Sequence, residues 1–584
     1  MRSARLVAIL SVVSWLACAV QAPRAPVSVA REETSNVLFG DYAGSAACAK
    51  CHATIAAKWL ASPMHNMTRT FAAGVSRAPW SGTALRFKDD TVELSEHDGA
   101  RFVHVHSARA GDGDYRVTRV IGGHYREDYA GVPVSEPPSV ANDEVVLPIS
   151  YLLWSKKFRY KGYSVMSRER PGVAVGPVWN RTCIFCHNTE PYFSDMLGGL
   201  LGPLSRQERR RVAYQGELVD PLLPPGERTH VAVDDEGALR RELQGELERL
   251  GARGEGDARA LARQAIEATR ARFTAKDLVE VGIGCESCHG GSKEHARDPS
   301  VRTSFAPHAP GFHFEPRASD AERVNRTCAR CHQVLFSRYP WTWEGGRRDA
   351  DPPGGSHINS GEGRDFLLSA CSKRASCTLC HDPHAPGSAP RDDDAVCTSC
   401  HAAEASRSHT HHDPSGPGAR CVACHMPKKN MTLDLRLGRY HRIGSPNDAD
   451  KLLDRPLECA LCHGDWTVKK IADDMERLWG KRIDRAVLDG VYGDLDQNVL
   501  DVTLARGKPH EQVVAMSLLG DRRVRRAAPA IAGQLGNEYP LVRYYAEKAL
   551  EEISGEPSPL DLNADDAAIR AAAASWVRKI EGEP

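Results

Sequence analysis

The chain of 584 residues contains eight copies of the pattern Cys-x-x-Cys-His, which places two thiols and one imidazole within five positions. The copies are numbered motif 1 to motif 8 in chain order. Their cysteines are Cys48 and Cys51, Cys183 and Cys186, Cys285 and Cys288, Cys328 and Cys331, Cys377 and Cys380, Cys397 and Cys400, Cys421 and Cys424, and Cys459 and Cys462. Their histidines are His52, His187, His289, His332, His381, His401, His425 and His463.

This pattern predicts covalent attachment of haem c. The two thiols add to the porphyrin vinyl groups, and the histidine binds the iron as its proximal ligand. Zinc is the alternative, because Cys-x-x-Cys pairs bind zinc where two pairs meet. A zinc site does not require a histidine directly after the second cysteine, whereas all eight copies have one. The sequence therefore predicts eight covalently bound haems.

Sixteen of the 24 histidines lie outside the motifs, which is enough to give every iron a second imidazole. His295 and His384 follow motif histidines by only six and three positions. Such short links cannot easily pass round the attached ring, so we expect each to bind the iron of another haem. The candidate distal ligands are His65, His295, His313, His357, His384, His409, His412 and His441, with His124 in reserve. An iron with two imidazoles has no open position and transfers electrons, whereas a five-coordinate haem would make an enzyme.

Three other residues are set apart from the haem ligands. His104 and His106 share one face of a predicted strand, and we expect that face to meet solvent rather than an iron. Cys371 belongs to no motif and is expected to be a small buried residue. A thiolate ligand or a redox-active thiol is the alternative for Cys371.

The composition and the N-terminus indicate an exported protein. Lys plus Arg and Asp plus Glu both number 76, so no basic excess suggests nucleic acid as a partner. Residues 1–19 resemble a signal peptide, with basic residues before an apolar run from Leu6 to Val20. Cleavage is expected near Ala17-Cys18-Ala19, with lipidation of Cys18 as the alternative. No later segment is predicted to span a membrane, so membrane contact is expected only if Cys18 is lipidated.

The predicted fold is mainly α with much irregular structure. A haem-carrying region is expected at 41–470, interrupted by a β-rich insertion at 82–165 and a helical insertion at 205–280. Residues 471–584 carry no motif and are predicted to be helical, with helices near 512–519, 524–535, 541–553 and 564–580. The string from Pro540 to Arg543 resembles HEAT-type helical repeats, which either form a short solenoid or cap the haem region.

Three strings resemble the multihaem cytochromes c: CESCHGG with His295 beyond it, CHDPH at 380–384 and CHMP at 424–427. That group includes the tetrahaem nitrification cytochrome, pentahaem nitrite reductase and hydroxylamine oxidoreductase. The resemblance is strongest to exported octahaem members with a helical-repeat tail, and it implies electron transfer. The nitrite reductases of the group and the octahaem tetrathionate reductase use lysine as the proximal ligand of the catalytic haem. All eight motifs here end in histidine, which argues against a nitrite-reductase-like site.

These observations predict a periplasmic, or otherwise exported, bacterial electron-transfer protein. Its expected partners are other redox proteins, either periplasmic cytochromes or a membrane quinol-linked donor. The alternative is an oxidoreductase that acts on a small nitrogen or sulfur oxyanion, or on a hydroxylamine-type substrate, at one open haem. The helical tail could additionally serve as a docking surface for redox partners.

Overall fold

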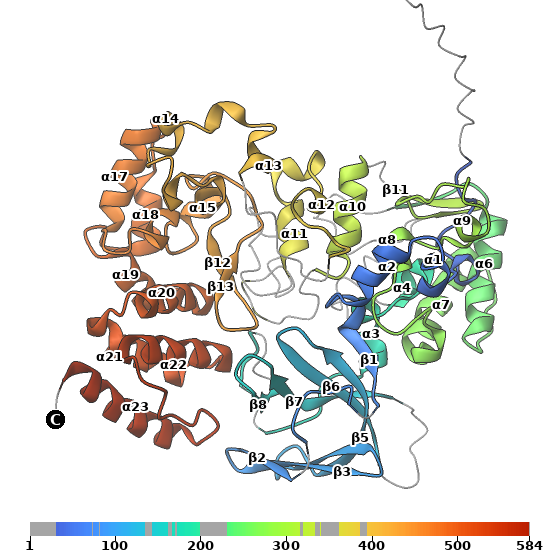
Figure 1. Cartoon of the computed structure of the whole chain (residues 1–584), viewed down its shortest axis with the longest axis horizontal. Coiled ribbons are helices and arrows are strands. Elements are labelled where there is room, and N and C mark those ends of the chain that lie inside the picture. Colours follow the sequence, from blue (N-terminus) through green and yellow to red (C-terminus); the bar gives the residue numbers. More distant parts are fainter. Residues whose placement is uncertain are drawn as a thin grey trace, which may run out of the picture.

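The computed structural model of the chain describes residues 31–582, except for 73, 81, 135–142, 162–165, 170–171, 199–229, 316–318, 333–338, 340, 342–360 and 386–393. The predicted leader with Cys18, the first part of the helical insertion and the candidate ligand His357 lie outside the described residues. The described elements form a large sheet, a region of short helices that carries most motifs, and a C-terminal run of helices (Figure 1).

The large sheet is antiparallel and contains eight strands. Seven of them follow one another in chain order from β2 to β8, and β1 pairs with β5. The strands are β1 (Thr68–Thr70), β2 (Thr83–Phe87), β3 (Asp90–His97), β4 (Ala100–His106), β5 (Gly113–Gly122), β6 (Arg126–Pro133), β7 (Val145–Leu152) and β8 (Lys157–Tyr160). In β4 the side chains alternate, because Val103 and Val105 are buried while His106 is exposed.

The segments around the first three motifs form a second region beside the sheet (Figure 1). Its helices are α1 (Ser45–Cys48), α2 (Ala53–Leu60), α3 (Ile184–His187), α4 (Tyr192–Gly198), α6 (Glu236–Arg249), α7 (Ala258–Arg272), α8 (Glu286–His289) and α9 (Lys293–Arg297). The side chains of Asp235 and Asp257 cap the N-termini of α6 and α7. A small sheet of β9 (His230–Val233), β10 (His308–Ala309) and β11 (Phe312–Glu315) lies against them.

The central region holds motifs 4 to 8 on short elements. They are α10 (Asp320–Ala329), α11 (Glu362–Leu367), α12 (Cys377–Cys380), α13 (Ala395–Thr398), α14 (Arg407–Thr410), α15 (Cys421–His425) and α16 (Ala449–Leu452), with a hairpin of β12 (Lys428–Met431) and β13 (Leu437–Arg439). Most of these helices have only four or five residues, so local hydrogen bonding alone cannot hold them. Among the described residues, no helix is both long and apolar enough to cross a bilayer.

The C-terminal helices bury the largest apolar cluster of the described chain. They are α17 (Val468–Trp479), α18 (Arg485–Tyr492), α19 (Val499–Arg506), α20 (Pro509–Asp521), α21 (Ala528–Gly533), α22 (Pro540–Ser554) and α23 (Asp566–Glu581). Gly480, Gly555 and Gly582 end α17, α22 and α23 in the left-handed conformation. The helix predicted at 524–535 is instead a short α-helix flanked by 3-10 turns.

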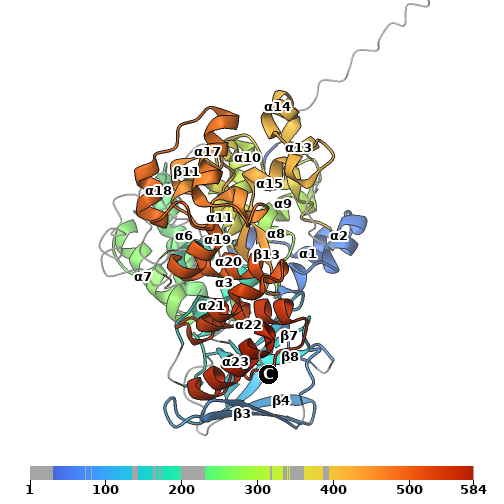
Figure 2. The same cartoon turned by 90° about the vertical axis from the view of Figure 1, so that its left-hand side faces the viewer.

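Of the C-terminal helices, α17 to α19 lie beside the central region, whereas α22 and α23 lie toward the large sheet (Figures 1 and 2). The amide of Lys88 at the end of β2 donates to the carbonyl of Asn563, at 2.6 Å. On the other side, the hydroxyl of Tyr545 donates to the carbonyl of Arg436, at 2.9 Å. The tail is therefore packed against both regions. The HEAT-type assignment stays a prediction.

Glu547 on α22 gives the tail a testable pH dependence. Burial raises the pKa of this carboxyl to about 7, although the hydrogen bond from Ser558 opposes the shift. The unfolded chain releases this proton near pH 4.5, so folding stability decreases as the pH rises from there through 7. We expect Glu547→Gln to raise stability at pH 8 by about 2 kcal/mol and to change it little at pH 4. Calorimetric unfolding at both pH values tests this, with Glu538→Gln on the exposed surface as control. An unchanged pH dependence in the Glu547 variant would contradict the assignment.

Candidate haem sites

Each motif forms a single helical turn. In six motifs the amide of the histidine donates to the carbonyl of the first cysteine, at 2.8–3.1 Å; these histidines are His52, His289, His332, His381, His401 and His463. In motif 7 the whole pattern lies within α15. Because this turn places both thiols and the imidazole on one side of the backbone, one porphyrin ring can bind all three groups.

Five motif histidines each face a histidine from outside the motifs. The ring centroids are 6.1–6.3 Å apart and the ring planes differ by 7–31°. The pairs are His52 with His295, His289 with His384, His381 with His441, His425 with His409, and His463 with His412. Every pair joins one predicted proximal ligand to one predicted distal ligand, and the two histidines of a pair lie between 16 and 243 positions apart in the chain.

The separation of these rings fits a metal ion between them. A metal–imidazole bond is about 2 Å long and the ring centre lies about 1.1 Å behind the bonded nitrogen, so two rings on opposite sides of one ion have centres about 6.2 Å apart. Aromatic rings in ordinary packing contacts have centroid separations anywhere from about 4.5 to 7 Å. The five separations here span only 0.2 Å. The donor set and its spacing therefore fit an iron with two imidazole ligands.

Backbone carbonyls orient several of these rings. The Nδ1–H groups of His295, His425 and His441 donate to the carbonyls of other residues, at 2.7, 2.9 and 3.1 Å. The ring of His412 makes the same contact with the carbonyl of Thr410, at 2.5 Å. A hydrogen bond at Nδ1 fixes the tautomer and leaves Nε2 available as the metal ligand. These carbonyls therefore hold each imidazole in the state that iron requires.

Three motif histidines, His187, His332 and His401, have no imidazole at this distance among the described residues. Burial lowers the pKa of His187 to about 4, and its Nδ1 is buried without a hydrogen-bond partner in the described chain. His332 lies 4.0 Å from a carboxylate oxygen of Glu362.

The remaining candidate ligands are not placed against a motif histidine. His65 lies in a 3-10 turn, and its buried Nδ1 has no hydrogen-bond partner among the described residues. His313 on β11 contacts the carboxylate of Asp234, at 3.1 Å. His124 packs edge-on against Tyr125. The predicted solvent-facing residue His104 bonds to Ser95 and Asp114, at 2.8 and 2.7 Å.

Cysteines of different motifs lie close together and order the motifs in space. Cys48 of motif 1 forms a hydrogen bond with Cys285 of motif 3, which lowers the pKa of the Cys285 thiol to about 6 and raises that of Cys48. Similar thiol contacts join motif 2 to motif 4 through Cys186 and Cys331, motif 4 to motif 5 through Cys328 and Cys377, and motif 6 to motif 7 through Cys397 and Cys421. The described cysteines form no disulfide.

Electrostatic contacts complete the order. Cys288 of motif 3 is a neighbour of Cys331, Cys380 of motif 5 is a neighbour of Cys397, and Cys424 of motif 7 is a neighbour of Cys459. The motifs therefore form a row in the order 1, 3, 4, 5, 6, 7 and 8, with motif 2 attached to motif 4 as a branch. We call this arrangement the motif row.

Cys371, which belongs to no motif, is partly buried in a 3-10 turn (Ala370–Lys373). Burial raises the pKa of its thiol, and Cys371 is an electrostatic neighbour of Cys397. A raised thiol pKa favours the unreactive protonated form. The ligand and redox roles considered for Cys371 stay predictions.

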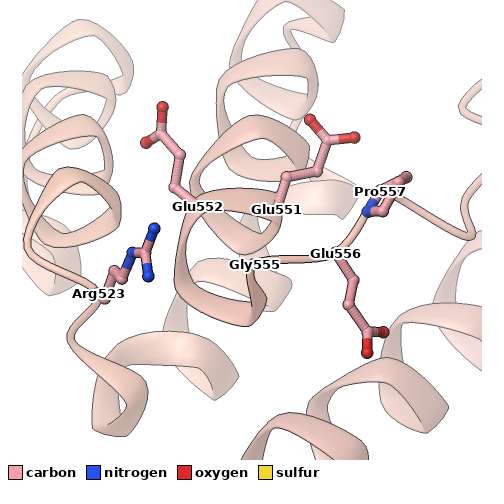
Figure 3. A pocket seen from close by; sticks show the side chains of 6 residues that line it. All are labelled: Arg523, Glu551, Glu552, Gly555, Glu556 and Pro557. Atoms are coloured by element: carbon pink, nitrogen blue, oxygen red, sulfur yellow. The ribbon is translucent and has the colours of Figure 1, made fainter.

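Two further clusters do not resemble haem sites. A groove on the C-terminal helices is lined by Arg523, Glu551, Glu552, Gly555, Glu556 and Pro557, which include no thiol or imidazole (Figure 3). Asp454, His510 and Glu511 lie close enough together to bind a cation. Lys429 contacts Asp454 at 3.0 Å and Arg455 contacts Glu511 at 3.0 Å, so protein cations already neutralise this acidic cluster.

The structure also reveals charged residues beside motif 2 that the sequence analysis did not identify. Lys161 and Arg126 both lie close enough to His187 to oppose its protonation. Arg159 is buried on the same sheet. The only sequence signal is the order Arg159, Tyr160, Lys161 within the β-rich insertion predicted at 82–165, because residues two positions apart in a strand share one face.

Comparison with known proteins adds little to this description. No protein-family model matches the chain, and no curated protein matches it. Among solved structures, the chain is similar to the crystal structure of the outer cell wall cytochrome OcwA, with a TM-score of 0.37 and 15% sequence identity over 92% of this chain and 100% of that chain. A likeness at that TM-score carries no argument about fold or function.

Proposed function

We propose that this chain is an exported c-type cytochrome that transfers electrons through eight covalently bound haems. The observation that carries the proposal is the set of five imidazole pairs with ring centroids 6.1–6.3 Å apart. Each pair combines a histidine that directly follows a Cys-x-x-Cys sequence with one that does not. This set of donors fits a haem that two thiols attach to the chain and whose iron binds two imidazoles.

The residues of the chain hold and orient the cofactor. The thiols of each motif would anchor it, and the motif histidine and its partner would bind the iron. Backbone carbonyls accept from Nδ1 of several rings, which leaves Nε2 available as the ligand atom. When bound, each haem supplies an iron that gains and loses one electron. Five irons that each bound two imidazoles would have no open position, which favours electron transfer over catalysis at those sites.

The motif row supports a continuous path for electrons. Cys51 of motif 1 and Cys462 of motif 8, at the two ends of the row, are exposed, as is Cys400 of motif 6 within the row. We propose that electrons enter near one end and leave near the other. The partners would be other redox proteins, either periplasmic cytochromes or a membrane quinol-linked donor. The apolar run at residues 6–20 supports export.

One observation favours a second candidate function. His187, His332 and His401 have no imidazole partner among the described residues, so one of their irons could keep an open position. An open haem would support reduction or oxidation of a small nitrogen or sulfur oxyanion or a hydroxylamine-type substrate. Binding of cyanide to the ferric protein separates the two functions. Rapid binding at a high-spin haem supports the second, whereas no binding supports electron transfer alone.

The haem content is the first prediction of this proposal. Protein produced with a haem-attachment system is expected to carry eight haems, measured as pyridine haemochrome per protein and as the intact mass after denaturation. Because Cys371 lies outside every motif, Cys371→Ala is the matched control and is expected to retain all eight. A protein that loses its haem on denaturation and acid-acetone extraction would contradict covalent attachment.

A further inference from the structure

One face of the large sheet collects charged side chains. Asp128 on β6, Ser150 on β7 and Arg159 on β8 are aligned across the strands, so their side chains point to the same side of the sheet. Arg126 lies two positions before Asp128 and therefore shares this side. Lys161 follows β8 directly and forms a hydrogen bond with the carboxylate of Asp128. We call Arg126, Asp128, Arg159 and Lys161 the basic face.

The opposite side of the same strands is apolar. Tyr129, Ile149 and Tyr160 alternate with the charged residues and belong to a buried hydrophobic cluster. The charged side of the sheet does not face solvent, because Asp128 and Arg159 are also buried. The basic face lies between the sheet and the regions packed against it.

The basic face carries three cationic groups and one carboxylate. Burial raises the pKa of Asp128, but Arg126 and Lys161 outweigh this and keep its pKa well below the ordinary value. Arg126 contacts the carboxylate through Nε at 3.1 Å, and the Ser150 hydroxyl donates to it at 2.5 Å. Arg126, Lys161 and Ser150 all bind the carboxylate of Asp128. The one negative charge of the basic face is therefore already paired with Arg126 and Lys161.

Arg159 is the cation that this arrangement leaves unmatched. Its side chain is 2% exposed, and within the described chain its Nε and Nη1 have no hydrogen-bond partner. Its guanidinium packs over the ring of Tyr544 on α22, at 5.4 Å. Nη1 of Arg126 is also buried without a partner among the described residues. Buried guanidinium groups without an anion are strongly unfavourable, so the face is built to receive negative charge.

The basic face is adjacent to motif 2. Lys161 is an electrostatic neighbour of both Cys183 and His187, and Arg126 is a neighbour of His187. In the sequence, by contrast, Lys161 lies 22 positions before Cys183. The excess of positive charge therefore extends from α22 toward motif 2, where Cys183 and Cys186 would attach a haem.

We propose that the basic face binds an oxyanion through Arg159 and Arg126. The planar guanidinium groups have N–H donors that match two oxygens of a carboxylate or a similar oxyanion. Two sources share this chemistry. One is a propionate of the haem on Cys183 and Cys186, which rests on the proposed function, and the other is a small free oxyanion.

The test uses the full-length, haem-loaded protein and its Arg159→Gln variant. The matched control is Arg543→Gln, because Arg543 on α22 is also buried but has carboxylate partners in Glu169 and Asp566. Spectroelectrochemical titration gives the midpoint potentials, and thermal unfolding is followed with and without phosphate or nitrite. Lys161→Met is the second variant, should Arg159→Gln fail to fold.

A propionate at the basic face predicts that Arg159→Gln shifts one midpoint potential to a more negative value, whatever anion is added. Removing a nearby positive charge disfavours the reduced haem, which has the more negative charge. A free oxyanion predicts that phosphate or nitrite raises the unfolding temperature of the wild type and of Arg543→Gln, but not of Arg159→Gln. The proposal is overturned if Arg159→Gln matches the control in both potentials and anion response. If the wild type carries no haem, the proposed function fails, while the anion response still tests this site.

Discussion

Replacing His441 by alanine is expected to convert one low-spin haem of the protein into a high-spin haem that binds cyanide. The ring of His441 faces that of His381 of motif 5, with centroids 6.3 Å apart and planes 26° apart. Its Nδ1 is held by the carbonyl of Arg439, at 3.1 Å, which leaves Nε2 for the iron. Without this ring the iron would lose one strong-field ligand, so its sixth position would open.

Low-temperature electron paramagnetic resonance of the ferric protein checks this result, because high-spin and low-spin haem give separate signals. His313→Ala is the matched control, since His313 was also a predicted distal ligand but contacts Asp234 at 3.1 Å. We expect the control to keep the wild-type spectrum. A His441 variant with an unchanged spectrum, or a new high-spin signal in the control, would show that the imidazole pairs do not report the iron ligands.

Removing the haem of motif 5 by Cys377→Ala with Cys380→Ala is expected to divide the protein into two electrically separate groups of haems. In the motif row, motif 5 is the link between motifs 1 to 4 and motifs 6 to 8. Removing the haem of motif 2 by Cys183→Ala with Cys186→Ala should leave the row intact, because motif 2 contacts the row only at motif 4. Electron tunnelling decreases steeply with distance, so the loss of one link in the row has a large effect.

Voltammetry of protein attached to an electrode near motif 8 measures this difference. Lys481→Cys provides the attachment, because Lys481 is exposed and lies two positions after Trp479. The ring of Trp479 contacts that of His411, and the next residue, His412, faces His463 of motif 8. At fast scan rates the motif 5 variant should exchange charge for three of its seven remaining haems, and the motif 2 variant for all seven. Pyridine haemochrome must first show seven haems in both variants. Equal charge from the two variants would rule out the motif row as the electron path.

Some features of this protein depend only on short stretches of chain. The eight motifs fall in this class, because two thiols and an imidazole within five residues meet on one helical turn wherever that turn lies. Helices α6 and α7 also follow from local signals, since Asp235 and Asp257 cap them and apolar residues recur along one face. Alternation in β4 likewise marks the buried positions Val103 and Val105.

The sequence by itself therefore determined where the paired thiols and motif histidines lie, and the alternating or helical character of many segments. It could not decide which histidine faces which motif: His441 lies 60 positions beyond His381 and His409 lies 16 before His425, and no rule of spacing connects them. Only the tertiary structure decided which histidines pair and that motif 2 branches from motif 4. It also decided that Arg159 is buried with Nε and Nη1 lacking a hydrogen-bond partner among the described residues. The physical reason is that contacts between distant residues depend on the path of the whole chain, whereas a motif depends only on its own turn.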